Sequence, residues 1–198
     1  GNAENALALR ARCHSKSLTV GSAHTACILF TIAKMDHDFR ETFIREPSAK
    51  RQYDLDMDVN LRTRLKENLG NDHVGAIISI LNITVPLSGE TRFWDFVAQV
   101  KASMNESIES KQHLHFLEAA KQFERASADM PVFQEKLKRN HGHAQEINFS
   151  NFTKYFHDTN YGELKLTKLY VSGGGCSPTF ASCVFWTATV NTNHYSFL

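Results

Sequence analysis

The sequence is poor in the features that identify a function quickly. It has four cysteines in 198 residues, and no two of them form a Cys-x-x-Cys pair: Cys13, Cys27, Cys176 and Cys183. This usage favours free thiols in a reducing, cytoplasmic setting over a disulfide framework or a zinc site. The net charge is only +1, so nothing points to nucleic acid or to an anionic membrane as a partner.

Long apolar runs and common catalytic motifs are also missing. No apolar run approaches the roughly 18 residues of a membrane span, so no transmembrane helix is predicted. There is no Gly-x-Ser-x-Gly elbow and no recognisable Cys-His nucleophile arrangement. The His113/His115 and His141/His143 pairs lack a cysteine or carboxylate at zinc-like spacing, and they predict no metal site. Length and composition allow one domain with a sizeable core.

What the sequence does contain is a pair of strong strand patterns between Tyr53 and Leu87. Apolar and polar residues alternate from Tyr53 to Leu61, and this period of two indicates a strand half-buried against a core. Asn60, Arg62 and Arg64 follow at its end, where polar side chains make fixed hydrogen bonds as a strand leaves its sheet. Residues 74–87 are rich in β-branched side chains, which predicts a strand buried on both faces and ending at Pro86.

Helical patterns flank these strands. Residues 3–13 predict one helix, and Thr19 is the expected N-cap of a second, largely buried helix that carries His24 as a packed residue. Residues 93–108 repeat apolar side chains at helical spacing and predict a long amphipathic helix. The charged stretch 36–52 predicts a surface loop, and residues 112–139 predict one or two further helices.

The C-terminal part predicts further strands. Residues 146–149 form a short strand candidate that leads into Ser150 and Asn151, and residues 163–171 alternate as a half-exposed strand. Residues 180–190 predict an apolar strand, followed by a hairpin turn at 191–193 and a partner strand at 194–198. Strands combined with long helices predict an α/β fold, an α+β arrangement in which a mixed sheet is flanked by helices.

The order of these motifs resembles the C-terminal lobe of condensation domains and alcohol acetyltransferases, in the chloramphenicol-acetyltransferase-like superfamily. The resemblance rests on Val59-Asn60-Leu61-Arg62-Thr63-Arg64-Leu65, followed by Val74-Gly75 and an apolar strand. It is extended by the phrase 18–26 in the second helix, the aromatic stripe 93–108, and Ser150-Asn151. Two departures are that Ser79 stands where the family has Asn, and Phe152-Thr153 where it often has Leu-Gly.

The resemblance implies that residues 1–198 form one lobe of a two-lobe acyltransferase, without the N-terminal catalytic lobe and the final helix. Such an enzyme moves an acyl group from a coenzyme A or carrier-protein pantetheine thioester to an alcohol or amine. Its general base belongs to the signature His-His-x-x-x-Asp-Gly, and no histidine in this chain is followed by Asp four residues later. The resemblance therefore implies no catalytic residue here and a partner lobe, in the same protein or a second chain. It also implies substrate-binding roles for five residues: Asn60, Arg62, Ser79, Ser150 and Asn151.

An alternative from another class is a non-catalytic α/β binding or assembly module. It accounts for the absent signature without a missing partner. The two hypotheses differ in the surface that they predict, because a lobe of a larger enzyme exposes apolar side chains where its partner packs. An independent module has no such need.

Overall fold

The computed structural model describes residues 3–67, 69–70, 73, 75, 77–115, 118, 135, 138, 145–154, 158–171, 181–190 and 192–197. Its elements in chain order are α1 (Ala3–Ser15), α2 (Val20–Met35), α3 (His37–Arg45), β1 (Arg51–Asn60), β2 (Ile78–Leu87), α4 (Phe93–Glu109), β3 (Gln145–Lys154), β4 (Asn160–Tyr161), β5 (Leu164–Lys165), β6 (Ala181–Val190) and β7 (Thr192–Phe197).

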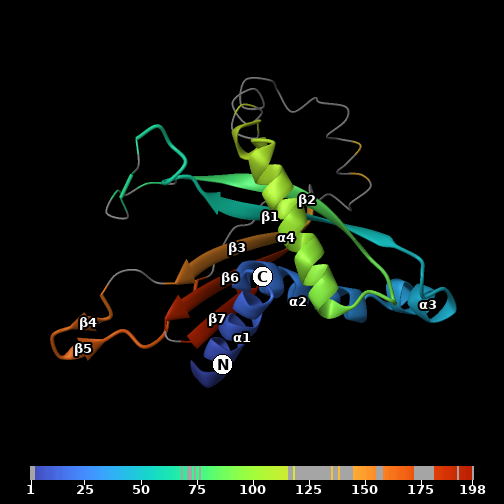
Figure 1. The fold of residues 1–198 in the computed structure, drawn as a ribbon, viewed down its shortest axis with the longest axis horizontal. Coiled ribbons are helices and arrows are strands. Elements are labelled where there is room, and N and C mark those ends of the chain that lie inside the picture. The colour runs from blue at the N-terminus through green and yellow to red at the C-terminus, as the bar shows by residue number, and fades with distance from the viewer. Residues whose placement is uncertain are drawn as a thin grey trace.

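Five strands form one mixed sheet in the order β2-β1-β3-β6-β7. The two outer pairs, β1 with β2 and β6 with β7, are antiparallel, whereas β3 runs parallel to both of its neighbours. The short strands β4 and β5 form a separate hairpin that stands apart from this sheet (Figure 1). The predicted fold class, α/β with a mixed sheet flanked by helices, is confirmed.

The alternation predicted for β1 is confirmed, because Tyr53, Leu55 and Met57 are all buried. The prediction for β2 was wrong in two respects. The strand begins at Ile78 and not at residue 74, and it buries only one face, with the Ile78 side chain 46% exposed. The cause is the packing around the strand: buried and more exposed residues alternate along β2, and α4 packs on the buried face.

Helices α2 and α4 provide the layer on that side of the sheet, and α4 crosses it diagonally (Figure 1). Helix α4 buries Phe96, Val97 and Val100, the residues that its helical spacing predicts. Phe30 of α2 contacts Phe96 edge to face, with ring centroids 5.4 Å apart. Thr19 caps α2 as predicted, and a capping box with Ser22 completes the helix start.

Helix α3 replaces much of the surface loop predicted for residues 36–52, so that prediction was wrong for residues 37–45 and also for residues 51–52, which belong to β1. Asp36 is its N-cap, and one carboxylate oxygen of Asp36 accepts a hydrogen bond from the Phe39 N–H at 3.0 Å. Phe39 is buried and contacts Tyr53 of β1 edge to face. A helix of nine residues is too short for its periodicity to stand out among so many charged side chains.

Several later boundaries also differ from the predictions. Strand β3 runs on to Lys154, so Ser150 and Asn151 lie within the strand and not after it. Of the stretch 163–171, only Leu164–Lys165 is a strand. The β6–β7 hairpin is confirmed, but the predicted turn at 191–193 was too long, because β7 begins at Thr192 and pairs it with Val190. Residue 191 lies outside the described residues. Most of the helices predicted within 112–139 also fall outside the described residues.

No single helix in the described part of the chain is long and apolar enough to cross a membrane. The helices α1 and α2 together have the length and the composition of a membrane span, but the pair is bent by 105° where the two helices meet. Much of α2 lies in the core, including Ala26 and Leu29.

Candidate functional site

Polar side chains gather where the first half of α2 crosses β3, β6 and β7. We call these residues, His24, Asn151, Thr187 and Tyr195, the α2–sheet cluster. Register explains their meeting: Asn151 pairs with Thr187, and Thr187 pairs with Tyr195, so the three side chains project from the same face of adjacent strands. The helices cover this face, and α2 brings His24 down onto it.

His24 is the buried centre of the cluster, with only 7% of its surface exposed. Its Nε2 lies 3.0 Å from the Tyr195 hydroxyl oxygen, and the two rings meet edge to face with centroids 5.2 Å apart. Burial lowers the pKa of His24 to about 4 because it penalises the charged ring. The imidazole is therefore neutral at physiological pH, and its buried Nδ1 has no hydrogen-bond partner among the described residues.

Asn151 occupies the strand side of the cluster. Its Oδ1 accepts a hydrogen bond from the Thr187 hydroxyl at 2.8 Å. Its amide nitrogen would lie 3.1 Å from a Cβ at position 21, so the glycine there lets Asn151 approach the first turn of α2 closely. Asn151 is one of the five residues predicted to bind substrate. The structure places it in a cluster with Thr187 and Tyr195, which belong to no sequence motif.

Ser150 points the opposite way from Asn151, because successive strand residues alternate between faces. It is buried and hydrogen-bonds the Asp58 carboxylate of β1, as does Asn148. The pKa of Asp58 is nevertheless raised, because burial of the charge outweighs these two hydrogen bonds. The two adjacent residues of the predicted Ser-Asn pair thus belong to different faces of the sheet.

Asn60 and Arg62 organise the chain where β1 ends. The Arg62 guanidinium donates to the backbone carbonyls of His73 at 3.0 Å and Gly75 at 3.2 Å. The Asn60 side-chain oxygen accepts from the Arg62 backbone N–H at 3.0 Å. These are the fixed hydrogen bonds expected at a strand end, and they join the two ends of the segment between β1 and β2.

Ser79 is the remaining residue of the predicted substrate-binding set. Its side chain is only 2% exposed, and its hydroxyl donates to the His113 carbonyl at 2.6 Å. Beside it, the Gln112 side-chain oxygen accepts from the Asn82 N–H on the outer edge of β2. Ser79 therefore anchors the segment after α4 to the sheet. The five predicted residues do not form one site, since only Asn151 reaches the α2–sheet cluster.

Thr187 and Tyr195 are the members that sequence reasoning missed. Each is an ordinary polar residue in an apolar strand, and no local motif distinguishes it. The signal that finds them is strand register, which assigns both to the face of Asn151. His24 was predicted to be a packed residue, and its burial confirms this.

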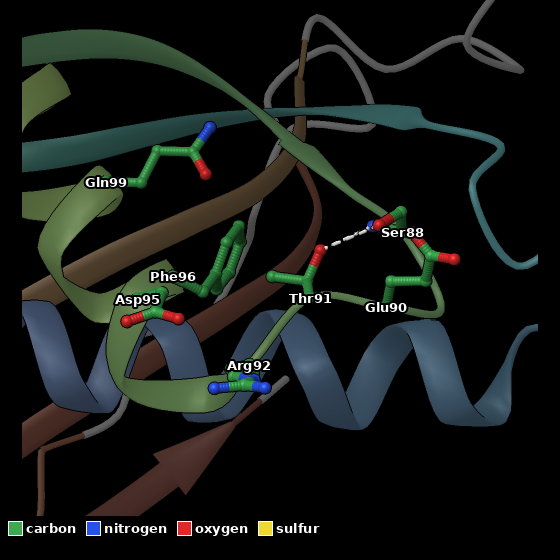
Figure 2. Close-up of a pocket in the computed structure, with 7 residues that line it drawn as sticks. All are labelled: Ser88, Glu90, Thr91, Arg92, Asp95, Phe96 and Gln99. Carbon is green, nitrogen blue, oxygen red and sulfur yellow. Dashed lines mark hydrogen bonds between the residues drawn. The ribbon is translucent and has the colours of Figure 1, made fainter.

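A hollow with a volume of about 310 Å³ lies at the start of α4 (Figure 2). Glu90, Arg92 and Asp95 line it, and all three are exposed. Its entry turn is held by Thr91, whose hydroxyl accepts from the Ser88 N–H at 3.0 Å. It is a surface hollow of mixed charge, and it contains none of the predicted site residues. No group of three or more potential metal ligands occurs among the described residues.

No protein-family model matches the sequence, and no curated protein matches it either. Among solved structures, the crystal structure of vinorine synthase is similar to this chain with a TM-score of 0.51 and 17% sequence identity. The match covers 100% of this chain and 41% of the vinorine synthase chain. At this identity the likeness concerns the fold alone. The chain thus spans less than half the length of the structure that it resembles.

Proposed function

We propose that this chain is one lobe of an acyltransferase. It moves an acyl group from a thioester, of coenzyme A or carrier-protein pantetheine, to an alcohol or amine. The observation that carries the proposal is the fold, because the whole chain is similar to part of vinorine synthase, which is itself an acyltransferase. The ordered sequence motifs, which resemble the same kind of lobe, support it independently.

In the proposed reaction, the acceptor oxygen or nitrogen attacks the thioester carbonyl, and an oxyanion forms. The carbon–sulfur bond then breaks, and the thiolate takes the proton that the acceptor has lost. A histidine of the partner lobe, within His-His-x-x-x-Asp-Gly, carries that proton. This chain supplies a wall of the channel, where fixed positions of substrate and hydrogen-bond donors account for much of such catalysis.

The residues proposed for substrate binding divide into two kinds of role. Asn151 contacts the substrate, because it belongs to the α2–sheet cluster and projects from the same face of the sheet as the half-exposed Tyr195, with Thr187 between them. Asn60, Arg62, Ser79 and Ser150 shape the channel through the backbone and side chains that they hold. Exposed apolar side chains, including Tyr161 and Leu164 on the β4–β5 hairpin, are consistent with a surface that a partner lobe covers.

The experiment uses the native particle, that is, this chain purified together with every polypeptide that is bound to it. Acetyl-coenzyme A is supplied with a panel of alcohols and amines, and the released thiol is measured. We expect thiol release that depends on both the particle and an acceptor. Release that never exceeds the rate without acceptor, across alcohols and amines, contradicts the proposal.

A further inference from the structure

The hydrogen bonds of His24 indicate which of its two ring nitrogens carries the proton. A neutral imidazole carries its proton on either Nδ1 or Nε2. Among the described residues, the buried Nδ1 has no hydrogen-bond partner, and Nε2 faces the Tyr195 hydroxyl. A buried N–H without a partner is rarer in proteins than a buried acceptor without one. The proton therefore sits on Nε2, and His24 donates to the oxygen of Tyr195.

This assignment fixes what the Tyr195 hydroxyl can do. Its oxygen accepts from His24, and it also accepts from the Asn193 side-chain amide, a bond that favours the phenolate. Both lone pairs are then occupied, so the hydroxyl proton points elsewhere. Burial nonetheless raises the pKa of Tyr195, so the group keeps its proton at neutral pH. Tyr195 is thus a neutral hydrogen-bond donor with its acceptor sites filled.

Tyr195 is also accessible. Its side chain is 51% exposed, and its strand β7 is the outer strand of the sheet. Cys27, one helical turn along α2 from His24, is exposed beside it and interacts electrostatically with Tyr195. Asn151 and Thr187 continue the polar line along the same face of the sheet. A ligand can therefore approach the Tyr195 side chain from solvent and extend across Thr187 toward Asn151.

A positioned, neutral donor is suited to an acceptor oxygen that gains negative charge. We infer that the Tyr195 hydroxyl, held by His24, donates a hydrogen bond to the carbonyl oxygen of the thioester and stabilises the oxyanion formed there. The inference rests on the proposed acyl transfer and assigns one of its steps to a named atom. Tyr195 touches the substrate in this arrangement, and His24 is the positioning residue behind it.

The test combines a measurement on the unaltered protein with a pair of variants. Nitrogen-15 NMR of the histidine rings reports the tautomer of His24. Isotope-edited infrared spectroscopy of acetyl-coenzyme A labelled with carbon-13 at the carbonyl reports hydrogen bonding to that oxygen in the bound state. The variant is Tyr195→Phe, and the matched control is Tyr170→Phe. Tyr170 is also exposed and packs edge to face on a histidine, His194.

We expect the Nε2–H tautomer and a lowered carbonyl frequency for bound acetyl-coenzyme A. Tyr195→Phe abolishes that lowering and reduces kcat about 100-fold, whereas KM changes little. Tyr170→Phe changes neither. In His24→Gln, we expect a carbonyl frequency between that of the wild type and that of Tyr195→Phe. A purely structural role of His24 does not produce this spectroscopic effect.

Three results overturn the inference. An Nδ1–H tautomer removes its basis. An unchanged carbonyl frequency in Tyr195→Phe, with acetyl-coenzyme A still bound, refutes the role of Tyr195 and leaves acyl transfer standing. Failure of the whole particle to bind acetyl-coenzyme A defeats the inference and the proposed thioester chemistry together.

Discussion

The direction in which each polar side chain points decides its role in this fold. Ser150 and Asn151 are neighbours in the sequence, yet one hydrogen-bonds Asp58 and the other joins Thr187 beneath α2. A motif written as adjacent letters suggests one site, whereas strand alternation separates the two residues. Experiments on the pair should therefore treat each residue separately.

His24 predicts a specific pH dependence of stability. Its pKa is lowered from 6.5 to about 4 in the folded chain, so between these values the unfolded chain binds more protons. The free energy of unfolding therefore falls as the pH drops from about 6.5 to 4, by on the order of 3 kcal/mol. Urea unfolding at a series of pH values measures this.

The variant His24→Gln removes the titrating ring. We expect its stability to vary less with pH over the same interval. The matched exchange His14→Gln, at an exposed histidine of α1, shows whether losing any histidine has that effect. Equal pH dependence in the wild type and His24→Gln would refute a buried, neutral His24.

Asp58 predicts the opposite behaviour for a carboxyl group. Its pKa is raised by burial, so the folded chain is less stable when Asp58 is charged. Asp58→Asn keeps the shape and still accepts from Ser150, and we expect it to raise the melting temperature at pH 7 by about 2–4 °C. The gain shrinks as the pH falls, since Asp58 in the wild type then becomes protonated. Calorimetry at pH 7 and pH 4 distinguishes this from a gain that is independent of pH.

At the scale of elements, the ends of β1 and β2 are held by single side chains. Arg62 donates to two carbonyls of the segment that follows β1. Arg62→Lys keeps the charge but loses the planar group that reaches both carbonyls. We expect faster proteolysis between residues 61 and 77, and Arg64→Lys, at an exposed position, serves as control. Equal cleavage rates in the two variants would show that the Arg62 contacts do not secure this segment.

Ser79 is the second such anchor. Ser79→Ala leaves the buried His113 carbonyl without its donor, which costs about 1–3 kcal/mol in unfolding free energy. Hydrogen exchange should also quicken at residues 112–115, which this bond ties to β2. Ser107→Ala on α4 controls for the loss of a hydroxyl. A loss of activity from Ser79→Ala without any loss of stability would instead support direct substrate contact.

Elements with long, regular patterns were predictable from the sequence. β1 and α4 have ten and seventeen residues, and their periods identified both the element and its buried face. α3 was missed because it has only nine residues, among them several charged ones and the buried Phe39, which is too short a pattern to recognise. The exposed face of β2 could not be foreseen either, because a β-branched run does not say whether other elements cover one face of the strand or both.

At the scale of the molecule, the site was less predictable than the fold. His24 and Tyr195 are separated by 171 positions in the sequence, and they meet only because α2 lies over the far end of the sheet. No spacing rule connects them. Asn151 entered the predicted set through a family resemblance, while its partner Thr187 follows from the register of β3 with β6.

The most direct test of the central claim is the intact mass of the native particle, with every polypeptide in it identified. If this chain is one lobe of a two-lobe acyltransferase, the native particle is heavier than the 22.4 kDa of this chain and contains a lobe with His-His-x-x-x-Asp-Gly. A stable, monodisperse 22.4 kDa species that releases no thiol from acetyl-coenzyme A would contradict the account and favour a non-catalytic binding module.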